Sequence, residues 1–186
     1  MYDVGDKVVY PHHGAGTIVT KELRKDAGAE REYLTIKILH NDMTVMIPSD
    51  SADRAGLRKV IGEETVDEVL AVLQGDGTKM PKNWNRRFKH NRDKMKTGDI
   101  FELAEVVRNL SLRDKDKGLS TGEKQMFVKA KKILASELMY AKNLSEDDAF
   151  DWLEGVLTDD DAPAAKRAPA GRPATTATKP KTPAAA

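Results

Sequence analysis

The densest positive charge in the sequence surrounds a tryptophan. Residues 79–96, KMPKNWNRRFKHNRDKMK, contain eight Lys or Arg residues and one acidic residue, Asp93. The cations of such a run can hold phosphates, and an indole can stack on a base or wedge beside one. These residue types therefore indicate contact with DNA or RNA. The candidate contacts in this run are Trp84, Arg86, Arg87 and Lys89.

The same tryptophan also has a purely structural interpretation. On a helix beginning near Asn83, Trp84, Phe88 and Met95 lie near one stripe, as core residues do, and the basic residues would form a solvated face. Pro81 and two asparagines around Trp84 favour an exposed role, because a side chain in the first helical turn can project past the helix end. If Trp84 is instead a core residue, its replacement by alanine should cost about 3–5 kcal/mol of stability.

Catalytic motifs are missing from the sequence. It has no Gly-rich phosphate loop followed by Lys and Ser or Thr, no zinc-binding His-Glu-x-x-His pair and no dinucleotide fingerprint. The absence of cysteine excludes disulfides, thiolate metal sites and cysteine nucleophiles. His12 and His13 are adjacent and would point to opposite faces of a strand, so loop histidines beside Pro11 are the simpler interpretation. We therefore expect neither an enzyme nor a bound cofactor or metal.

The charge balance excludes a uniformly basic nucleic-acid coat protein. The chain has 186 residues with 31 Lys and Arg against 30 Asp and Glu, a net charge of +1. Residues 162–186 hold five basic and no acidic residues, so removing those five charges leaves −4 on the rest. Nucleic-acid contact must therefore use a local patch. No stretch approaches the roughly 18 apolar residues of a membrane span, and no apolar signal core is present, so a cytoplasmic location is expected.

The C-terminal segment 159–186 is expected to be disordered. Residues 162–186 contain no Val, Ile, Leu, Met, Phe, Tyr or Trp that could join a core, and Pro and Ala dominate. A solubilising tail without a specific partner is one interpretation, and loose electrostatic contact with nucleic acid is the other.

Short β-strands are expected in the first 50 residues. The segments DKVVY, AGTIVTKEL, EYLTIKIL and TVMIP are rich in Val, Ile, Thr and Tyr, and several alternate apolar with polar residues. Turn residues at Pro11, Gly14, Gly28 and positions 40–42 separate them. Four short strands predict a small bent sheet or partly open barrel over residues 1–52, with an edge strand to which another protein could add a strand.

The apolar spacing becomes helical in residues 53–158. In EETVDEVLAVLQ the apolar residues recur at intervals of three and four and share one face. Predicted helix starts lie at Asn83, Asp99, Ser120 and Ser145, and Ser120 with Glu123 forms a capping box. An all-α bundle of four or five helices is therefore expected.

These motifs together resemble the CarD/CdnL family of bacterial transcription regulators. They are VGDKVVYPHHGAG at 4–16, TVMIP at 44–48, NWNRRFK at 83–89, TGDIFELAEVVRNL at 97–110 and GLSTGEKQMFVKAKKILASEL at 118–138. The resemblance covers nearly the whole chain to about residue 157. It implies an α+β fold with a Tudor/SH3-like β-barrel at 1–52, a helical DNA-binding domain at 53–158 and a disordered tail at 159–186.

The resemblance implies a monomeric, non-enzymatic transcription regulator without a cofactor. Its N-terminal domain would bind the RNA polymerase β subunit through a strand edge, at positions matching Arg24, Thr44, Val45, Met46 and Ile47. Its helical domain would contact promoter DNA at the upstream edge of the transcription bubble and stabilise the open complex without sequence-specific readout. The family's tryptophan, a minor-groove wedge, falls on Trp84, and its basic positions fall on Arg86, Arg87, Lys89 and Lys124. Some members have an arginine where this chain has Met46, so we expect a more apolar polymerase contact here.

Three rival functions are distinguishable. A nucleoid-type protein acting without polymerase would bind duplex DNA stably on its own. The polymerase-binding module of transcription-repair coupling translocases resembles residues 1–50, but this chain lacks their motor motifs. A structural interaction protein would use Trp84 as a core residue.

Overall fold

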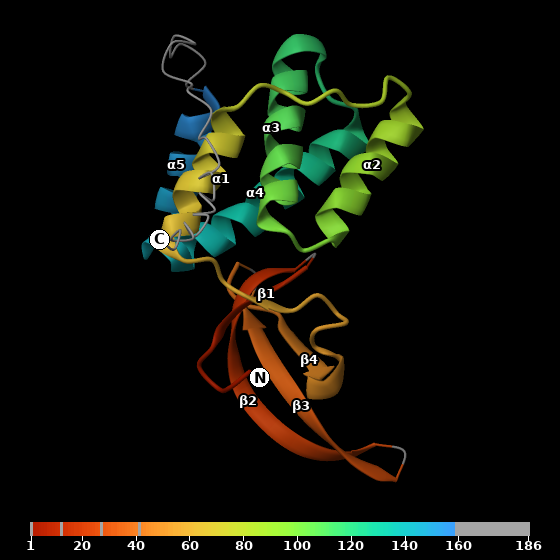
Figure 1. The fold of residues 1–186 in the computed structure, drawn as a ribbon, viewed down its shortest axis with the longest axis vertical. Helices are drawn as coiled ribbons and strands as arrows, with labels where there is room; N and C mark the ends of the chain where they lie inside the picture. Colours follow the sequence, from red (N-terminus) through yellow and green to blue (C-terminus); the bar gives the residue numbers. More distant parts are fainter. Residues whose placement is uncertain (1, 12, 27, 41, 159–186) are drawn as a thin grey trace, which may run out of the picture.

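The protein consists of an antiparallel β-sheet and a bundle of helices that lies beside one end of the sheet (Figure 1). The computed structural model describes residues 2–11, 13–26, 28–40 and 42–158. In Figure 1 the helices lie above the sheet, and the long hairpin of the second and third strands points away from them.

In the described residues, five strands form one antiparallel sheet. They are β1 (Lys7–Tyr10), β2 (Gly14–Asp26), β3 (Ala29–Ile38), β4 (Thr44–Pro48) and β5 (Arg58–Lys59), with a 3-10 helix at Ser49–Ser51 after β4. The order across the sheet is β4-β3-β2-β1-β5, so β4 and β5 are its edges. Leu34, Ile36 and Ile38 alternate along β3 and are fully buried, as the apolar alternation predicts. They pack with Val8, Ile18 and Ile47.

The sequence pattern does not predict β5. Its Arg58 and Lys59 pair with Val9 and Val8 of β1, in a part of the chain where we expected the helical domain. Two residues are too few to show alternation, and neither is β-branched or aromatic.

Between the sheet and residue 158, where the described part of the chain ends, there are five helices. They are α1 (Glu63–Gln74), α2 (Trp84–Lys96), α3 (Ile100–Lys117), α4 (Thr121–Lys142) and α5 (Glu146–Thr158). The starts of α2, α3, α4 and α5 agree with the four predicted caps. The side chains of Asn83 and Asp99 accept hydrogen bonds from backbone N–H groups in the first turns of α2 and α3, and Ser120 and Glu123 form the capping box of α4. Each bond satisfies a donor that a helix start leaves free.

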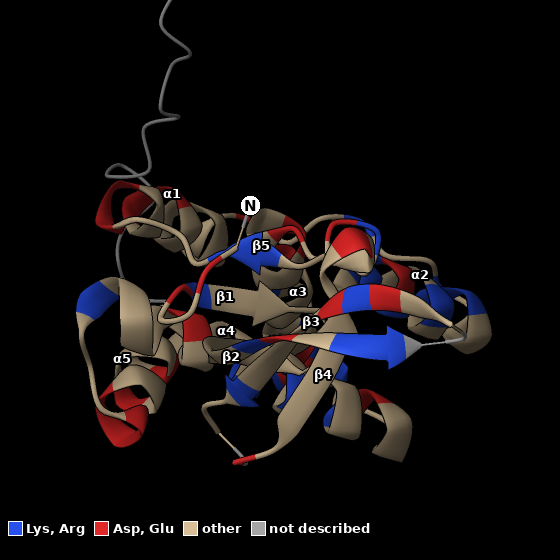
Figure 2. Ribbon diagram, turned by 90° about the horizontal axis from the view of Figure 1, so that it is seen from below, with Lys and Arg blue, Asp and Glu red and all other residues tan. Residues whose placement is uncertain are grey.

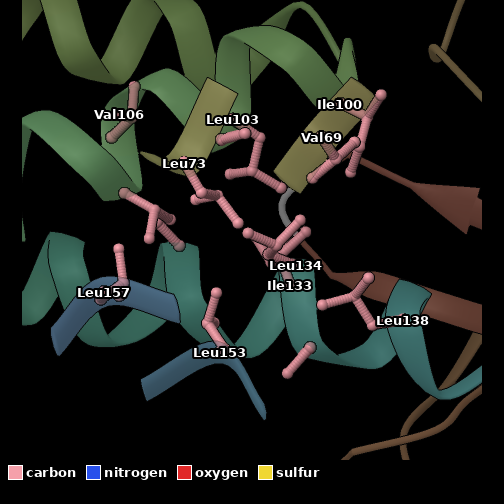
Figure 3. Packing of buried hydrophobic residues seen from close by; sticks show 14 of the residues in the cluster. Val69, Leu73, Ile100, Leu103, Val106, Ile133, Leu134, Leu138, Leu153 and Leu157 are labelled. Carbon is pink, nitrogen blue, oxygen red and sulfur yellow. The ribbon is translucent and has the colours of Figure 1, made fainter. Parts of the chain in front are cut away.

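One hydrophobic core holds the helices together (Figure 3). Its centre lies between α3 and α4, and α1 and α5 close it from the side. The labelled contributors are Val69 and Leu73 from α1, Ile100, Leu103 and Val106 from α3, Ile133, Leu134 and Leu138 from α4, and Leu153 and Leu157 from α5. Because burial of each large aliphatic side chain is worth about 1.5–3 kcal/mol, this core fixes the frame on which α2 lies.

The sheet and the helices share a buried polar junction. Arg58 of β5 donates to both carboxylate oxygens of Glu137 on α4, at 2.5 and 2.8 Å, and Glu137 is fully buried. The neighbouring Ser136 Oγ accepts a hydrogen bond from the Ala15 N–H of β2 at 2.9 Å. These bonds join β2 and β5 to the same helix, so the two parts of the protein are connected by specific contacts as well as by the chain.

Gly14 allows this close approach. Its φ is +92°, a conformation that favours glycine, and a Cβ at this position would lie 2.8 Å from Ser136 Oγ. Any side chain at residue 14 would therefore strain β2 and collide with α4.

The predicted α+β fold class, a small β module followed by a helical bundle, is confirmed. The division at residue 52 stays a prediction, and so does the tail, because residues 159–186 lie outside the part of the chain that the structure describes.

Candidate nucleic-acid interface

Trp84 is the first residue of α2, and its side chain reaches solvent. The helix begins there because the Asn83 side chain accepts a hydrogen bond from the Arg86 N–H at 3.2 Å. Trp84 is 45% exposed, whereas tryptophan side chains are on average highly buried. This exposure fits a contact residue better than a core residue.

Two contacts hold the indole ring of Trp84. The ring stacks on Phe88, with centroids 5.3 Å apart and 23° between the planes. Its Nε1 donates a hydrogen bond to Ser120 Oγ at 2.8 Å. Gly122 lies against both rings, because a Cβ there would be 3.3 Å from Phe88 and 3.6 Å from Trp84. The ring is thus held in place before any partner binds, which reduces the entropy lost on binding.

A buried carboxylate supports this arrangement from inside. Glu123 is 1% exposed, and its Oε2 accepts hydrogen bonds from the N–H and Oγ of Ser120 at 3.1 and 2.8 Å. Its Oε1 accepts one from Arg87 Nε at 2.6 Å. Arg87 Nη1 also donates to two backbone carbonyls just before α2, at 3.2 and 2.9 Å. A continuous set of bonds therefore runs from Arg87 through Glu123 and Ser120 to the Trp84 ring.

These bonds set the charge state of Glu123. Burial alone would raise the pKa of its carboxyl group, but hydrogen bonds from Arg87 and Ser120, with the Arg87 charge, outweigh burial and lower the pKa below its ordinary value. The carboxylate therefore stays ionised at neutral pH, and Arg87 stays paired.

The predicted basic contacts divide into two groups. Arg86, Lys89 and Lys124 are exposed. Lys124 lies one helical turn after Ser120, the residue that holds the Trp84 ring, and its N–H donates to the Ser120 carbonyl at 2.8 Å. Arg87 is 3% exposed, and its guanidinium is used inside the protein. Arg87 therefore does not share the exposure of the other predicted contacts, which are Trp84, Arg86, Lys89 and Lys124. We call the four exposed residues Trp84, Arg86, Lys89 and Lys124 the Trp84 surface. Arg86 and Lys89 follow Trp84 by two and five positions, so on α2 they project from other sides of the helix than the ring.

The sequence pattern misplaces the buried face of α2. It indicates a stripe through Trp84, Phe88 and Met95, but the buried residues are Arg87, Asn91 and Met95 at intervals of four. Phe88 is partly buried against the helical core. Spacing alone cannot distinguish a buried arginine from an exposed one, because burial depends on a carboxylate that α4 supplies from 36 residues away. The sequence predicts Ser120 only as a helix cap. No feature of the sequence indicates that its side chain also accepts a hydrogen bond from Trp84.

Basic and acidic helices lie on opposite sides of the bundle (Figure 2). α2 has six Lys or Arg residues and one acid, whereas α1 and α5 have acidic residues and no basic ones. Figure 1 places α1 and α5 together, with α3 and α4 between them and α2. Lys94 of α2 is paired with Glu102 and Glu105 of α3, at 2.8 and 2.7 Å, so it adds little free positive charge. The remaining cations give this side of the bundle a local positive potential on a body that is acidic overall.

The predicted polymerase-binding strand β4 is an edge of the sheet. Its outer residues Thr44 and Met46 are exposed, Met46 by 40%, while Val45 and Ile47 turn toward the core. The four predicted contacts of β4 therefore separate into two that a partner's side chains could touch and two that hold the strand on the sheet. An edge strand also offers backbone groups for pairing.

Arg24 lies on the same face of the sheet as Met46, but not beside it. Thr20 and Met46 both pair with Thr35 of β3, so all three share a face, and Arg24 follows Thr20 by four residues. β4 pairs only as far as Tyr33, whereas Arg24 pairs with Arg31 further along the hairpin. Its guanidinium is 3.2 Å from a carboxylate oxygen of Glu22. Contact with Arg24 and β4 together would need a partner that extends along the hairpin.

The part of the chain that the structure describes offers no cluster of three His, Cys, Asp or Glu side chains suited to a metal ion. His13 lies in a turn, where its ring stacks on Tyr10 with centroids 5.0 Å apart, and its neighbour His12 lies outside the described residues. No helix in residues 2–158, gaps excepted, is long and apolar enough to cross a membrane.

Comparison with known proteins gives consistent results for both parts of the chain. A family model described as CarD-like/TRCF RID domain matches residues 2–61, and one described as CarD, C-terminal domain matches residues 68–154. A curated protein of Bacillus subtilis (strain 168), named "Putative transcription factor YdeB", is 36% identical over 146 residues, which are 78% of this chain and 95% of that protein. The solution NMR structure of the N-terminal domain of Myxococcus xanthus CarD is 29% identical, covering 32% of this chain and 79% of that one with a TM-score of 0.29.

Proposed function

The chain belongs to the CarD family of transcription factors, and from this membership we propose that it stabilises the open promoter complex of RNA polymerase. β4 and its outer face would bind the polymerase β subunit, and the Trp84 surface would bind promoter DNA at the upstream edge of the bubble. The observation that carries the proposal is the exposed Trp84 ring, held by Ser120 and Phe88 at the start of a helix that carries exposed cations.

The ring suits a wedge at the junction between paired and unpaired DNA. Its Nε1 already donates to Ser120, so the ring offers a partner its exposed apolar surface. Stacking on a base is worth roughly 1–3 kcal/mol and is sequence-tolerant, because every base has a π-face. Arg86, Lys89 and Lys124 would hold backbone phosphates, which position a protein without reading sequence.

Binding to the melted state alone shifts the equilibrium between closed and open complexes. A ligand shifts such an equilibrium by its differential affinity for the two states, and about 1.4 kcal/mol corresponds to tenfold. Contact with the polymerase would raise the local concentration of the Trp84 surface at the bubble, so weak DNA contact is sufficient. The description of the N-terminal match, CarD-like/TRCF RID, supports interaction with polymerase as the tether.

Loss of the Trp84 ring should shorten the lifetime of the open complex. Wild-type protein is expected to lengthen the open-complex lifetime on a promoter, Trp84→Ala to lose most of that effect, and Trp84→Phe to keep part of it because phenylalanine can still stack. Dissociation of preformed complexes after a competitor is added measures the lifetime, and circular dichroism checks that each variant is folded.

Two outcomes would contradict the proposal. An equal effect of wild type and Trp84→Ala would leave the ring without a role on DNA. Stable binding of wild type to duplex DNA in the absence of polymerase would favour a polymerase-independent nucleoid-type protein instead.

A further inference from the structure

We infer that a groove along α4, between the Trp84 surface and the sheet, is a second binding surface for the DNA sugar–phosphate backbone. This inference rests on the proposed function and extends it to residues that the family resemblance does not assign. The groove has a volume of about 440 Å³. Its polar lining is His40, Lys124, Gln125, Lys129 and Lys132, and its apolar lining is Val128, between the lysines, and Ile133.

The groove follows one side of α4. Lys124, Val128 and Lys132 are four residues apart and share a face, and Lys129 lies beside them one turn after Gln125. At 1.5 Å per residue, Lys124 and Lys132 are about 12 Å apart along the helix axis. Each strand of B-DNA advances about 3.4 Å per nucleotide along the axis, so this length matches roughly three to four nucleotides.

The groove is continuous with the Trp84 surface. Lys124 belongs to both. In addition, Gln125 and Lys129 line a neighbouring hollow that is also lined by Phe88, Gly122, two further cations and two methionines. Phe88 and Gly122 lie against the Trp84 ring. A backbone held at Trp84 could therefore pass over α2 and along α4 toward the sheet.

The charges in the groove favour a polyanion. Among the residues that the structure describes, no carboxylate lines the groove. Burial lowers the pKa of His40 and of the nearby His13, and the charges of Lys132 and Lys129 respectively lower each further. Glu146 acts in the opposite direction on His40 but does not line the groove.

An exposed valine among three lysines fits a sugar–phosphate backbone better than a free phosphate. Val128 is 48% exposed. A small anion such as free phosphate would make no favourable contact with this apolar side chain. A nucleic-acid strand presents phosphate oxygens to the lysines and apolar sugar carbons to the valine. An acidic protein segment would have no reason to continue from the Trp84 surface.

The salt dependence of DNA binding tests this surface. The full chain is titrated onto a fork-junction DNA, and the slope of log affinity against log salt is compared for wild type, Lys129→Gln/Lys132→Gln and the control Lys25→Gln/Lys59→Gln. The control removes two charges at exposed residues of the sheet. Loss of two phosphate contacts should reduce the slope by about 1.8, at roughly 0.9 per contact, while the control should keep the wild-type slope. If the Lys129→Gln/Lys132→Gln variant, the α4 variant, has the same salt slope as the control, the inference is overturned.

A cross-linking experiment locates the contact directly. The sequence has no cysteine, so Val128→Cys provides a single thiol for a photo-activated cross-linker, with the 70% exposed Leu23, as Leu23→Cys, for comparison. In the complete promoter complex, residue 128 is expected to cross-link to upstream DNA and residue 23 is not. Cross-linking of residue 128 to polymerase alone, or to nothing, overturns the inference.

These outcomes separate failure of the inference from failure of the proposed function. If wild type binds fork DNA in a Trp84-dependent way while the α4 variant keeps its slope, only the inference fails. If wild type neither binds fork DNA nor alters the open complex, both fail together.

Discussion

At the scale of single residues, Ser120 performs two tasks that can be separated. Its side chain caps α4 and also receives the indole N–H of Trp84. Ser120→Ala should lose about 0.5–2 kcal/mol of stability through the cap, and part of the open-complex effect because the ring is no longer held. Ser145→Ala removes an equivalent bond, from the Asp148 N–H at the start of α5, and should cost similar stability while keeping the effect. Ser120→Thr keeps a hydroxyl and should restore function.

Chemical denaturation and open-complex lifetimes measure the two tasks of Ser120. Full activity in Ser120→Ala would show that stacking on Phe88 alone is enough to position the ring.

Arg86 and Arg87 are neighbours with opposite expected roles. Arg87→Ala leaves the Glu123 carboxylate buried without its main partner, a change that typically costs about 3–5 kcal/mol. Arg113 Nε, 3.7 Å from Glu123, offsets part of this. Arg86→Ala should leave stability within about 0.5 kcal/mol, but weaken DNA binding and reduce its salt slope by about 1. If Arg87→Ala kept wild-type stability but bound DNA more weakly, Arg87 would be a DNA contact and not a structural residue.

At the scale of elements, the start of α4 should be sensitive to acid. Because the folded protein lowers the pKa of Glu123, this residue's contribution to stability is complete above the unfolded pKa, near 4.5, and is lost as pH falls through the lower folded pKa. Glu123→Gln keeps a capping-box side chain but removes the charge. The variant should be less stable than wild type at pH 7, and the difference should shrink on acidification below about pH 4.5.

Urea midpoints of both proteins across this pH range test the role of Glu123. A stability difference that stays constant with pH would mean that the charge of Glu123 contributes nothing and that shape alone matters.

Element starts and the apolar faces of β3 and α1 were predictable, and the buried face of α2 was not. Asn83, Asp99 and Ser120 mark helix starts because each cap bond is local in sequence. The buried face of α2 depends on Glu123, and β5 exists because β1 offers it a partner, so neither is written in local spacing. Glu137 was not predicted to be buried. It stands among apolar residues of α4, where a charge indicates a buried partner but not which arginine supplies it.

At the scale of the whole molecule, the proposed contact surfaces are far apart and joined through one junction. In Figure 1, α2 begins at the end of the bundle away from the sheet, and β4 lies in the sheet. A tether raises the effective concentration of a second contact only if its geometry lets both contacts form at once. The Arg58–Glu137 pair, with the Ser136 bond to Ala15, holds that geometry.

Breaking the junction should therefore separate polymerase binding from the effect on DNA. Arg58→Ala leaves the fully buried Glu137 without its cation and is expected to cost about 3–5 kcal/mol. The single unfolding transition expected of wild type should broaden or split, because the sheet and the bundle no longer unfold together. Lys59→Ala, the next residue of β5, removes only an exposed pair with Asp6 at 3.6 Å and should behave as wild type.

Calorimetry, polymerase capture and open-complex lifetimes are measured on wild type and on both variants of β5. Normal capture with a shortened lifetime in Arg58→Ala is the expected result, since the β4 edge survives but no longer places Trp84 at the fork. A split transition with an undiminished lifetime would instead mean that a flexible connection positions Trp84 well enough.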